Sequence, residues 1–526
     1  MVHLSATAPA LGPNDEFALG MALARLGRLA QAEQALRTGE RQCPNDKRFP
    51  TELGGVAFEQ KHYAEAAHWL RRARRLDPAD AYVSNFLGTV YFLAGNLDAA
   101  LQAWNRVQKP MIDNLDLDPH LRVHRLLLER AFAFSPHAVP GEQQFLTTES
   151  RLDGLGIFPA SSLHLNALPN GHFDAVFRAQ EQDGFGSSPL EAAVSTLGGL
   201  PYETIYPSYS NLRRSAMNVE SLFRWDAQKR RAWVALSAPL SNLPWWRWRV
   251  SADLHNENWA IRRSFTGTSP VLASLNLERE ALAANLTSLS TSRLQWSLGG
   301  ELSHRNFRNV IPGTALGPAL LTPGFELRQT ASLRAPLLHF PGHRFALDGS
   351  AKSDFARTFS SPSYASETLQ GAAHADWLPQ MEGDRYELTE HLRGGRIFGT
   401  VPFDDLFLFG MDRDDTNLDL RAHLGTRDGR KGSAPIGSGY LLSNTDFYRR
   451  LYTNGLLTIH VGPLLDIGRM TAPNPALSSQ QWLFDAGVEA RLTVLNTSVV
   501  LSYGRDLRTG ANAFYGTAAP PAMTLP

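Results

Sequence analysis

The chain has 526 residues, which is enough for several domains and excludes a single small one. Lys plus Arg number 51 and so do Asp plus Glu, so the formal net charge is zero and no overall basic field would attract nucleic acid. A single cysteine, Cys43, can neither close an intramolecular disulfide nor build a multi-cysteine zinc site. No run approaches the roughly 18 apolar residues of a membrane helix, which excludes a helical membrane protein and leaves a transmembrane β-barrel open.

Residues 1–13 carry no cationic segment followed by an apolar core, so they do not have the pattern of a secretory signal. Either the protein stays inside the cell or a leader is missing. We interpret these residues as a leader remnant or a disordered segment.

A repeat of 34 residues fills the first part of the chain. Leu-Gly pairs and alanines recur in one register, at Leu19, Gly20, Ala32, Leu53, Gly54, Ala66, Leu87, Gly88 and Ala100. Small residues at a fixed period allow two helices to approach closely, and Pro44 and Pro78 end the first two units because proline cannot continue a helix. Residues 14–108 therefore resemble three tetratricopeptide repeats, with Lys61 replacing the glycine found at Gly27 and Gly95. Such a stack binds a protein segment in its concave face or serves as a spacer.

Residues 109–186 predict a small α+β domain. A strand over 111–117 is followed by a helix that starts at Asp118-Pro119 and by a second helix from about 140–144. Two alternating strands, 162–168 and 172–179, then enclose a Pro-Asn-Gly turn. This β-α-α-β-β order, together with residues 151–159 and 171–177, resembles a polypeptide-transport-associated (POTRA) domain. The resemblance implies a sheet edge that accepts an extended substrate strand, and the alternative is a hinge without that role.

After a linker over 187–201, segments of alternating hydrophobicity follow one another without helices. In residues 293–302, for example, Leu294, Trp296 and Leu298 alternate with polar side chains. A soluble sandwich could bury such faces, but a barrel in lipid accounts directly for so many two-faced strands. We predict an outer-membrane barrel over 202–516 with about 16 strands, because each crossing takes about 10 residues and an even number lets the ends meet antiparallel. A tail over 517–526 completes the chain.

An aromatic cluster near the start of the predicted barrel is typical of an interfacial girdle. It comprises Trp245, Trp246 and Trp248. The alternative is an ordinary exposed aromatic patch.

Repeats, a POTRA-like domain and a barrel together resemble the bacterial surface antigen superfamily of outer-membrane assembly and two-partner secretion barrels. The family's late loop carries an arginine-glycine-aromatic motif that folds into the lumen, and Arg421-Ala422-His423 occupies the corresponding place here. Its acidic partner lies in an acid-x-glycine signature, which Asp466-Ile467-Gly468 matches. The resemblance implies a lock between Arg421 and Asp466. The departures from the family pattern are Ala422 and His423, and the alternative is that Arg421 is a solvated loop residue.

We place the last strand at residues 497–506. The aromatic pair Phe514-Tyr515 beyond it is either an internal assembly signal or part of a tail with another role.

No metal helix, nucleophile elbow or phosphate loop occurs, and the 16 histidines lack ligand spacing. The sequence therefore predicts no catalytic, cofactor or metal site. The expected fold is multidomain: a tetratricopeptide solenoid, an α+β POTRA-like domain and a transmembrane antiparallel β-barrel.

The resemblance implies a non-enzymatic outer-membrane protein that inserts or translocates polypeptides, with its N-terminal domains in the periplasm. Its expected partners are unfolded or extended polypeptides, a periplasmic protein that binds the repeats, and the lipid bilayer. One alternative is a structural or adhesive barrel without transport, and another is a soluble β-rich scaffold.

Overall fold

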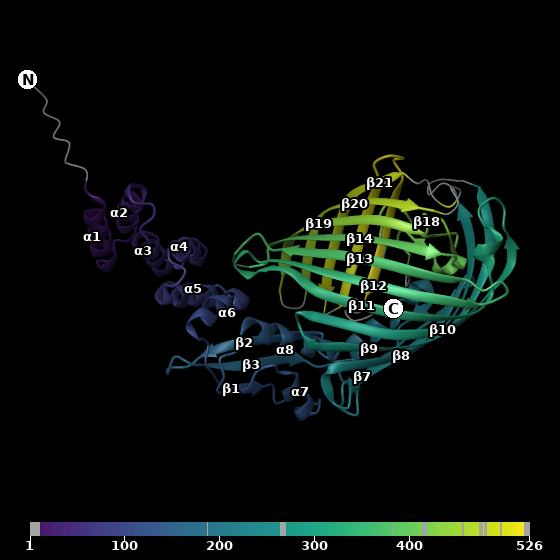
Figure 1. The fold of residues 1–526 in the computed structure, drawn as a ribbon, viewed down its shortest axis with the longest axis horizontal. Helices are drawn as coiled ribbons and strands as arrows, with labels where there is room; N and C mark the ends of the chain where they lie inside the picture. The colour runs from purple at the N-terminus through teal and green to yellow at the C-terminus, as the bar shows by residue number, and fades with distance from the viewer. Residues whose placement is uncertain are drawn as a thin grey trace, which may run out of the picture.

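The computed structural model describes residues 11–186, 188–262, 270–381, 383–412, 418–454, 457–472, 477, 481–494 and 497–519. Helical repeats come first, a three-stranded sheet follows, and a large closed barrel completes the chain (Figure 1). Residues 1–10 of the expected leader remnant (1–13) and residues 520–526 of the expected tail (517–526) lie outside the described residues.

Six helices form three antiparallel pairs: α1 (Pro13–Arg25), α2 (Leu29–Gln42), α3 (Arg48–Glu59), α4 (Tyr63–Leu76), α5 (Ala81–Leu93) and α6 (Leu97–Trp104). The repeated glycines lie where the helices of a pair touch. A Cβ on Gly88, for instance, would lie 2.3 Å from Trp104 Cδ1. The three repeated alanines are fully buried, as the small-residue periodicity predicts. No helix within the described residues has the length and apolar character needed to cross a membrane.

One repeat position differs from the expectation. Leu53 is 2% and Leu87 0% exposed, whereas Leu19 is 41% exposed. In a solenoid this position packs against the preceding repeat, and the described chain has no repeat before the first one. The prediction that Leu19 packs in the stack is therefore wrong.

The turns between paired helices have a left-handed residue. Gly27 and Gly95 adopt φ values of 72° and 77°, and Lys61 takes the same role with φ 60°. Left-handed backbone costs a residue with a Cβ roughly 1–2 kcal/mol. Lys61 is thus a locally strained member of the repeat.

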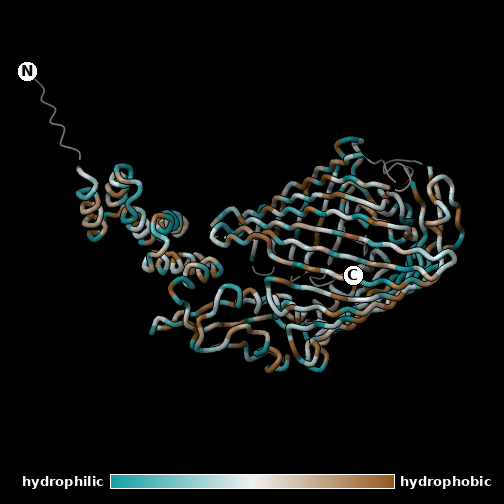
Figure 2. The backbone as a smooth tube through the Cα atoms, in the orientation of Figure 1, coloured by the Kyte–Doolittle hydropathy of each residue, from teal (hydrophilic) through white to brown (hydrophobic). Residues whose placement is uncertain are grey.

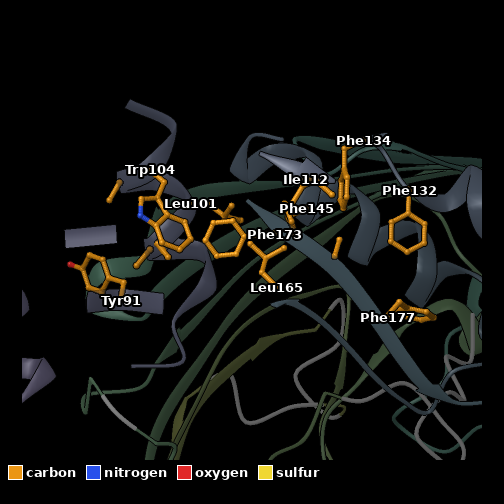
Figure 3. Close-up of a cluster of buried hydrophobic side chains, with 14 of the residues drawn as sticks. Tyr91, Leu101, Trp104, Ile112, Phe132, Phe134, Phe145, Leu165, Phe173 and Phe177 are labelled. Atoms are coloured by element: carbon orange, nitrogen blue, oxygen red, sulfur yellow. The ribbon is translucent and has the colours of Figure 1, made fainter. Parts of the chain in front are cut away.

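The small domain contains β1 (Ile112–Leu117), α7 (Arg125–Ala131), α8 (Glu142–Gly154), β2 (Ala160–Ala167) and β3 (Phe173–Gln180), in the predicted order. Its sheet has the order β1-β3-β2, with β1 parallel and β2 antiparallel to β3. The sheet shares one apolar core with the repeats (Figure 3). At the junction, the rings of Trp104 and Phe173 lie 5.2 Å apart. This continuity couples the repeats to the sheet.

The barrel wall is formed by β4 (Thr204–Ile205), β5 (Ser208–Leu212), β6 (Met217–Trp225), β7 (Lys229–Leu240), β8 (Leu243–Arg262), β9 (Val271–Thr291), β10 (Leu294–Ile311), β11 (Gly324–Phe340), β12 (Phe345–Phe359), β13 (Ala365–Trp377), β14 (Tyr386–Gly399), β19 (Gly439–Thr453), β20 (Leu457–Thr471), β21 (Trp482–Val494), β22 (Thr497–Asp506) and β23 (Asn512–Ala519). Apolar and polar residues alternate along these strands (Figure 2). In β11, Phe325 and Leu327 are exposed while Glu326 between them is buried. Apolar side chains therefore point outward and polar ones point into the lumen.

The number of strands is close to the expected 16, but the number of passes through the wall is odd rather than even. β4 and β5 both pair with β6 and form one pass, and every neighbouring pair from β5 round to β23 is antiparallel. The described wall thus makes fifteen passes, so the first and last run in the same direction. The seam between β23 and β4 is parallel, which differs from the antiparallel closure expected.

Two boundaries also differ from the sequence expectation. The linker contains a helix, α9 (Pro189–Leu197), and the last described strand is β23 rather than residues 497–506. Phe514 and Tyr515 lie within β23, so they are part of the wall.

The N-terminal domains bind one end of the barrel through its short hairpins. From the repeats, Arg71 Nη1 donates to the carbonyl of Gly342 at 2.9 Å and Asn96 Nδ2 to that of Pro341 at 2.8 Å, both in the turn between β11 and β12. Arg151 of α8 donates to the carbonyl of Ser290 at 2.7 Å. Since strands alternate in direction, the longer connections lie at the opposite end.

Candidate functional site: a loop folded into the lumen

The connection between β14 and β19, residues 400–438, is here called the lumen loop. Its elements are η5 (Phe403–Asp405), β15 (Phe407–Leu408), β16 (Thr426–Arg427), β17 (Arg430–Lys431) and β18 (Ile436–Gly437), and residues 413–417 are outside the description. It starts at the end opposite the N-terminal domains, yet Phe409 and Leu420 are fully buried against the wall. The loop therefore folds back into the barrel.

Arg421 contacts three acidic residues on three consecutive strands. Its Nη2 lies 2.6 Å from Asp466 Oδ1, and its Nη1 lies 2.5 Å from Asp446 Oδ1 and 3.1 Å from Glu489 Oε2. Its backbone N–H donates to Asp466 Oδ2 at 2.9 Å. A planar guanidinium can serve several carboxylates at once and stays charged when buried. The structure thus brings together the two residues that the family resemblance pairs, and adds two acids to them.

The excess negative charge at this point is spread over neutral donors. Glu489 accepts hydrogen bonds from the hydroxyls of Ser502, at 2.6 Å, and Tyr448. Asn444 Nδ2 donates to Asp466 Oδ1 at 2.7 Å. These hydrogen bonds stabilise the ionised carboxylates around the Arg421 guanidinium.

Asp466, Asp485 and Asp506 stand directly opposite one another on β20, β21 and β22, and we call them the acidic row. Arg421 lies over Asp466, while the Ala422 N–H donates to Asp485 Oδ2 at 2.7 Å. His423 Nε2 lies 3.4 Å from Asp485 Oδ1 and 3.7 Å from Asp506 Oδ2. Three successive loop residues therefore follow one row of the wall.

The family departures at Ala422 and His423 do not prevent this arrangement. A Cβ on Gly504 of β22 would lie 2.5 Å from the carbonyl carbon of Arg421, so the loop backbone rests directly on that glycine. Ala422 and His423 are 3% and 1% exposed. The wall glycine supplies the space for the close approach.

A second anchor, of opposite charge, holds the beginning of the loop. Asp404 and Asp405 of η5 meet Arg279, Arg305 and Arg328 on β9, β10 and β11. Arg305 is 1% exposed, and its Nη1 lies 3.1 Å from Asp405 Oδ2 and 3.0 Å from Glu326 Oε2. Acids on the loop thus bind bases on this part of the wall.

Two further ion pairs fix the loop to β7 and β8. Asp412 Oδ1 lies 3.1 Å from Lys229 Nζ, and Lys431 Nζ lies 2.8 Å from Glu257 Oε1. Lys431 also lies over the ring of Trp259 at 5.4 Å. The loop is therefore bound to the wall on both sides of the lumen.

The comparisons with known proteins give one family match and several similar solved structures. Residues 51–110 match the tetratricopeptide repeat family model. Similar solved structures include CdiB from Acinetobacter baumannii, at 12% identity over 78% of this chain and 73% of that chain with a TM-score of 0.45, and CdiB from Escherichia coli, at 11% identity over 78% and 74% with a TM-score of 0.48. BamA from Haemophilus ducreyi lacking POTRA domains 1–3 matches at 10% identity over 78% and 84%, with a TM-score of 0.42. A search of curated proteins finds no match.

The three tryptophans of the predicted girdle do not share a face. In β8, Trp246 and Trp248 are an even number of residues from the exposed Val250, so their side chains lie on the same face as Val250. Trp245 lies on the opposite face. Trp245 lies under the Arg151 guanidinium of α8, at 5.3 Å. Trp245 is thus a contact to α8 of the small α+β domain, and the girdle remains a prediction.

Sequence reasoning missed the second anchor and the rest of the acidic row. The available signal was the polar face of each strand, on which Arg305, Arg328 and Glu326 all lie. Without strand register, however, nothing in the sequence pairs these faces with Asp404 and Asp405, which lie 76 or more residues beyond Arg328.

Proposed function

We propose that this chain is an outer-membrane protein that inserts or translocates polypeptides, with the repeats and the POTRA-like domain in the periplasm. The observation that carries the proposal is the buried contact between Arg421 and Asp466, because it holds a loop inside a barrel that would otherwise be open. A substrate passes when this loop shifts or when the wall opens along the seam between β23 and β4.

The N-terminal domains would receive such a substrate. β2 is at the edge of its three-stranded sheet, and most of its side chains are exposed. Main-chain hydrogen bonding at this edge would bind an extended polypeptide without demanding a particular sequence. The concave face of the repeats would bind a periplasmic protein.

The first experiment tests location and fold. The chain is expressed with an added secretory leader, membranes are fractionated, and electrophoretic migration is compared with and without boiling. We expect a folded outer-membrane species that migrates differently when unboiled. Soluble, heat-insensitive material would refute the proposal and favour the scaffold.

The second experiment separates transport from a structural or adhesive barrel. Single-channel conductance in a planar bilayer is measured with and without an unfolded polypeptide on the side of the repeats. We expect openings that depend on the polypeptide and decrease when β2 is blocked by a Leu163→Pro substitution, with Ser161→Ala as the matched control. A silent channel that never responds would favour the structural alternative.

A further inference from the structure

The acidic row places two carboxylates face to face without a matching cation. Asp485 and Asp506 are directly opposite in the register of β21 and β22, and both are 0% exposed. Like charges opposite each other on neighbouring strands are destabilising, and burial increases the cost. Within the described chain neither residue forms an ion pair with Lys or Arg. An imidazolium at His423 would supply one positive charge for two negative ones.

The three side chains have the geometry of a cation site. Their ligand atoms, one from each of His423, Asp485 and Asp506, all lie within 4.8 Å of one another. Asp485 Oδ1 is buried, accepts no hydrogen bond from any described group, and faces His423 Nε2. His423 Nε2 lies 3.4 Å from Asp485 Oδ1 and 3.7 Å from Asp506 Oδ2, close to the roughly 3.4 Å that separates two ligand atoms of a tetrahedral zinc site.

Both carboxylates are already oriented by the protein. Asp485 Oδ2 accepts the Ala422 N–H, and Asp506 Oδ1 accepts the Arg508 N–H at 2.8 Å. The hydroxyl of Thr509 donates to Asp506 Oδ2 at 2.6 Å. Such outer partners fix ligand orientation in metal sites.

We propose that His423, Asp485 and Asp506 bind one zinc ion, which joins the tip of the lumen loop to β21 and β22. One imidazole nitrogen with two carboxylate oxygens at this spacing suits Zn²⁺, whereas Mg²⁺ and Ca²⁺ take six or more oxygen ligands. A water molecule would complete the coordination. The sequence gives no spacing signal for this site because the ligands come from a loop and two strands, 62 and 83 residues from His423.

The test measures metal in the folded full-length protein, purified in detergent through a tag without histidines. After treatment with chelator and titration with ZnCl₂, mass spectrometry should find one tightly held zinc per chain. His423→Phe should abolish it, while His304→Phe, at a histidine whose ring contacts Phe325 of the wall, should retain it. Co²⁺ in place of zinc should give the visible absorption of a tetrahedral site in the parent chain and not in His423→Phe.

Asp506→Asn keeps the shape of the Asp506 side chain. It serves as the second variant if His423→Phe does not fold, as judged by the altered migration of unboiled protein. It should weaken zinc binding at least about tenfold, since loss of outer-shell partners alone costs that much. Equal zinc content in the parent chain and in folded His423→Phe, or equal zinc affinity in the parent chain and in folded Asp506→Asn, would overturn the proposal, and His423 would then be an ion-pair partner only.

Discussion

Arg421 donates to Asp466 twice over, through its backbone N–H at 2.9 Å and through its guanidinium at 2.6 Å. One carboxylate therefore fixes both the path of the loop and the direction of its central side chain. Replacing Asp466 therefore affects a backbone hydrogen bond and a side-chain ion pair together, whereas a surface ion pair involves side chains alone.

Asp466→Asn should release the tip of the lumen loop while leaving the barrel in the membrane. Removing one partner of a buried ion pair costs about 3–5 kcal/mol, because the other charge stays buried. Export or insertion should fall, and proteolysis within the loop should become faster. The control is Asp348→Asn, whose partner Arg334 is exposed and whose loss should cost at most about 1 kcal/mol. Unchanged activity in a folded Asp466→Asn protein would remove this contact from the mechanism.

Removing the charge of Asp405 in the second anchor should lower the stability of the barrel strongly, because this one carboxylate contacts two arginines. Asp405→Asn leaves Arg305 and Arg328 with less compensation in a buried site, so the barrel should lose about 3–5 kcal/mol. The measurement is the temperature at which the heat-modifiable band converts to the unfolded one. It should decrease for Asp405→Asn and stay within error for Asp348→Asn, and a result with equal temperatures would show that η5 is not an anchor.

Lys61→Gly should stabilise the repeats. Glycine removes the left-handed strain at φ 60° but adds freedom to the unfolded chain, which leaves a net gain of about 0.5–1 kcal/mol. Urea unfolding followed by helical circular dichroism reports this, because the long helices lie in the N-terminal domains. Lys61→Ala is the matched control and should give no gain, so stabilisation by both variants would assign the effect to loss of the lysine side chain.

The interface between the repeats and the small α+β domain should weaken as pH rises toward neutrality. Burial, with the carboxylates of Asp98 and Asp153 adding to it, raises the pKa of Glu149 from 4.5 to about 7. Between these values the folded state holds a proton that the unfolded state has released, so stability is complete below pH 4.5 and decreases up to about pH 7. We expect a loss of about 1–2 kcal/mol, reduced from the full linkage value because the side chain is partly exposed.

The urea titration described for Lys61, repeated at pH 5 and pH 8, measures this dependence. Glu149→Gln should remove most of it and stabilise the protein at pH 8. Glu129→Gln, at an exposed ion pair with Arg125, is the control and should keep the dependence. A parent chain equally stable at both pH values would contradict the prediction.

Local periodicity determined much of what the sequence predicts correctly. The 34-residue spacing at Gly20, Gly54 and Gly88 predicted the helix pairs because those contacts lie within one repeat. The strand alternation that includes Phe325 and Leu327 predicted the wall for the same local reason. Leu19 failed because its burial depends on a neighbour beyond the repeat itself.

From the sequence, only those residues of the site that belong to a recognised family motif could be predicted. Arg421 and Asp466 could be paired from the family resemblance, whereas Asp446 and Glu489 required strand register. The alignment of the three aspartates in the acidic row also depends on strand register, since a shift of one residue would turn the side chain of Asp485 to the outer face. Parity of the seam likewise depends on β4 and β5 sharing one pass, which no local pattern reveals.

The anchors of the lumen loop lie on strands made before it in the chain, β7 to β11, and on strands made after it, β19 to β22. Each anchor is a contact of fixed length, so the loop sets the distance between opposite sides of the wall. Widening the circumference by opening the seam would have to stretch or break anchors on at least one side. The anchored loop therefore limits the diameter of the barrel. Its ion pairs resist expansion of the wall, and the loop itself blocks the lumen.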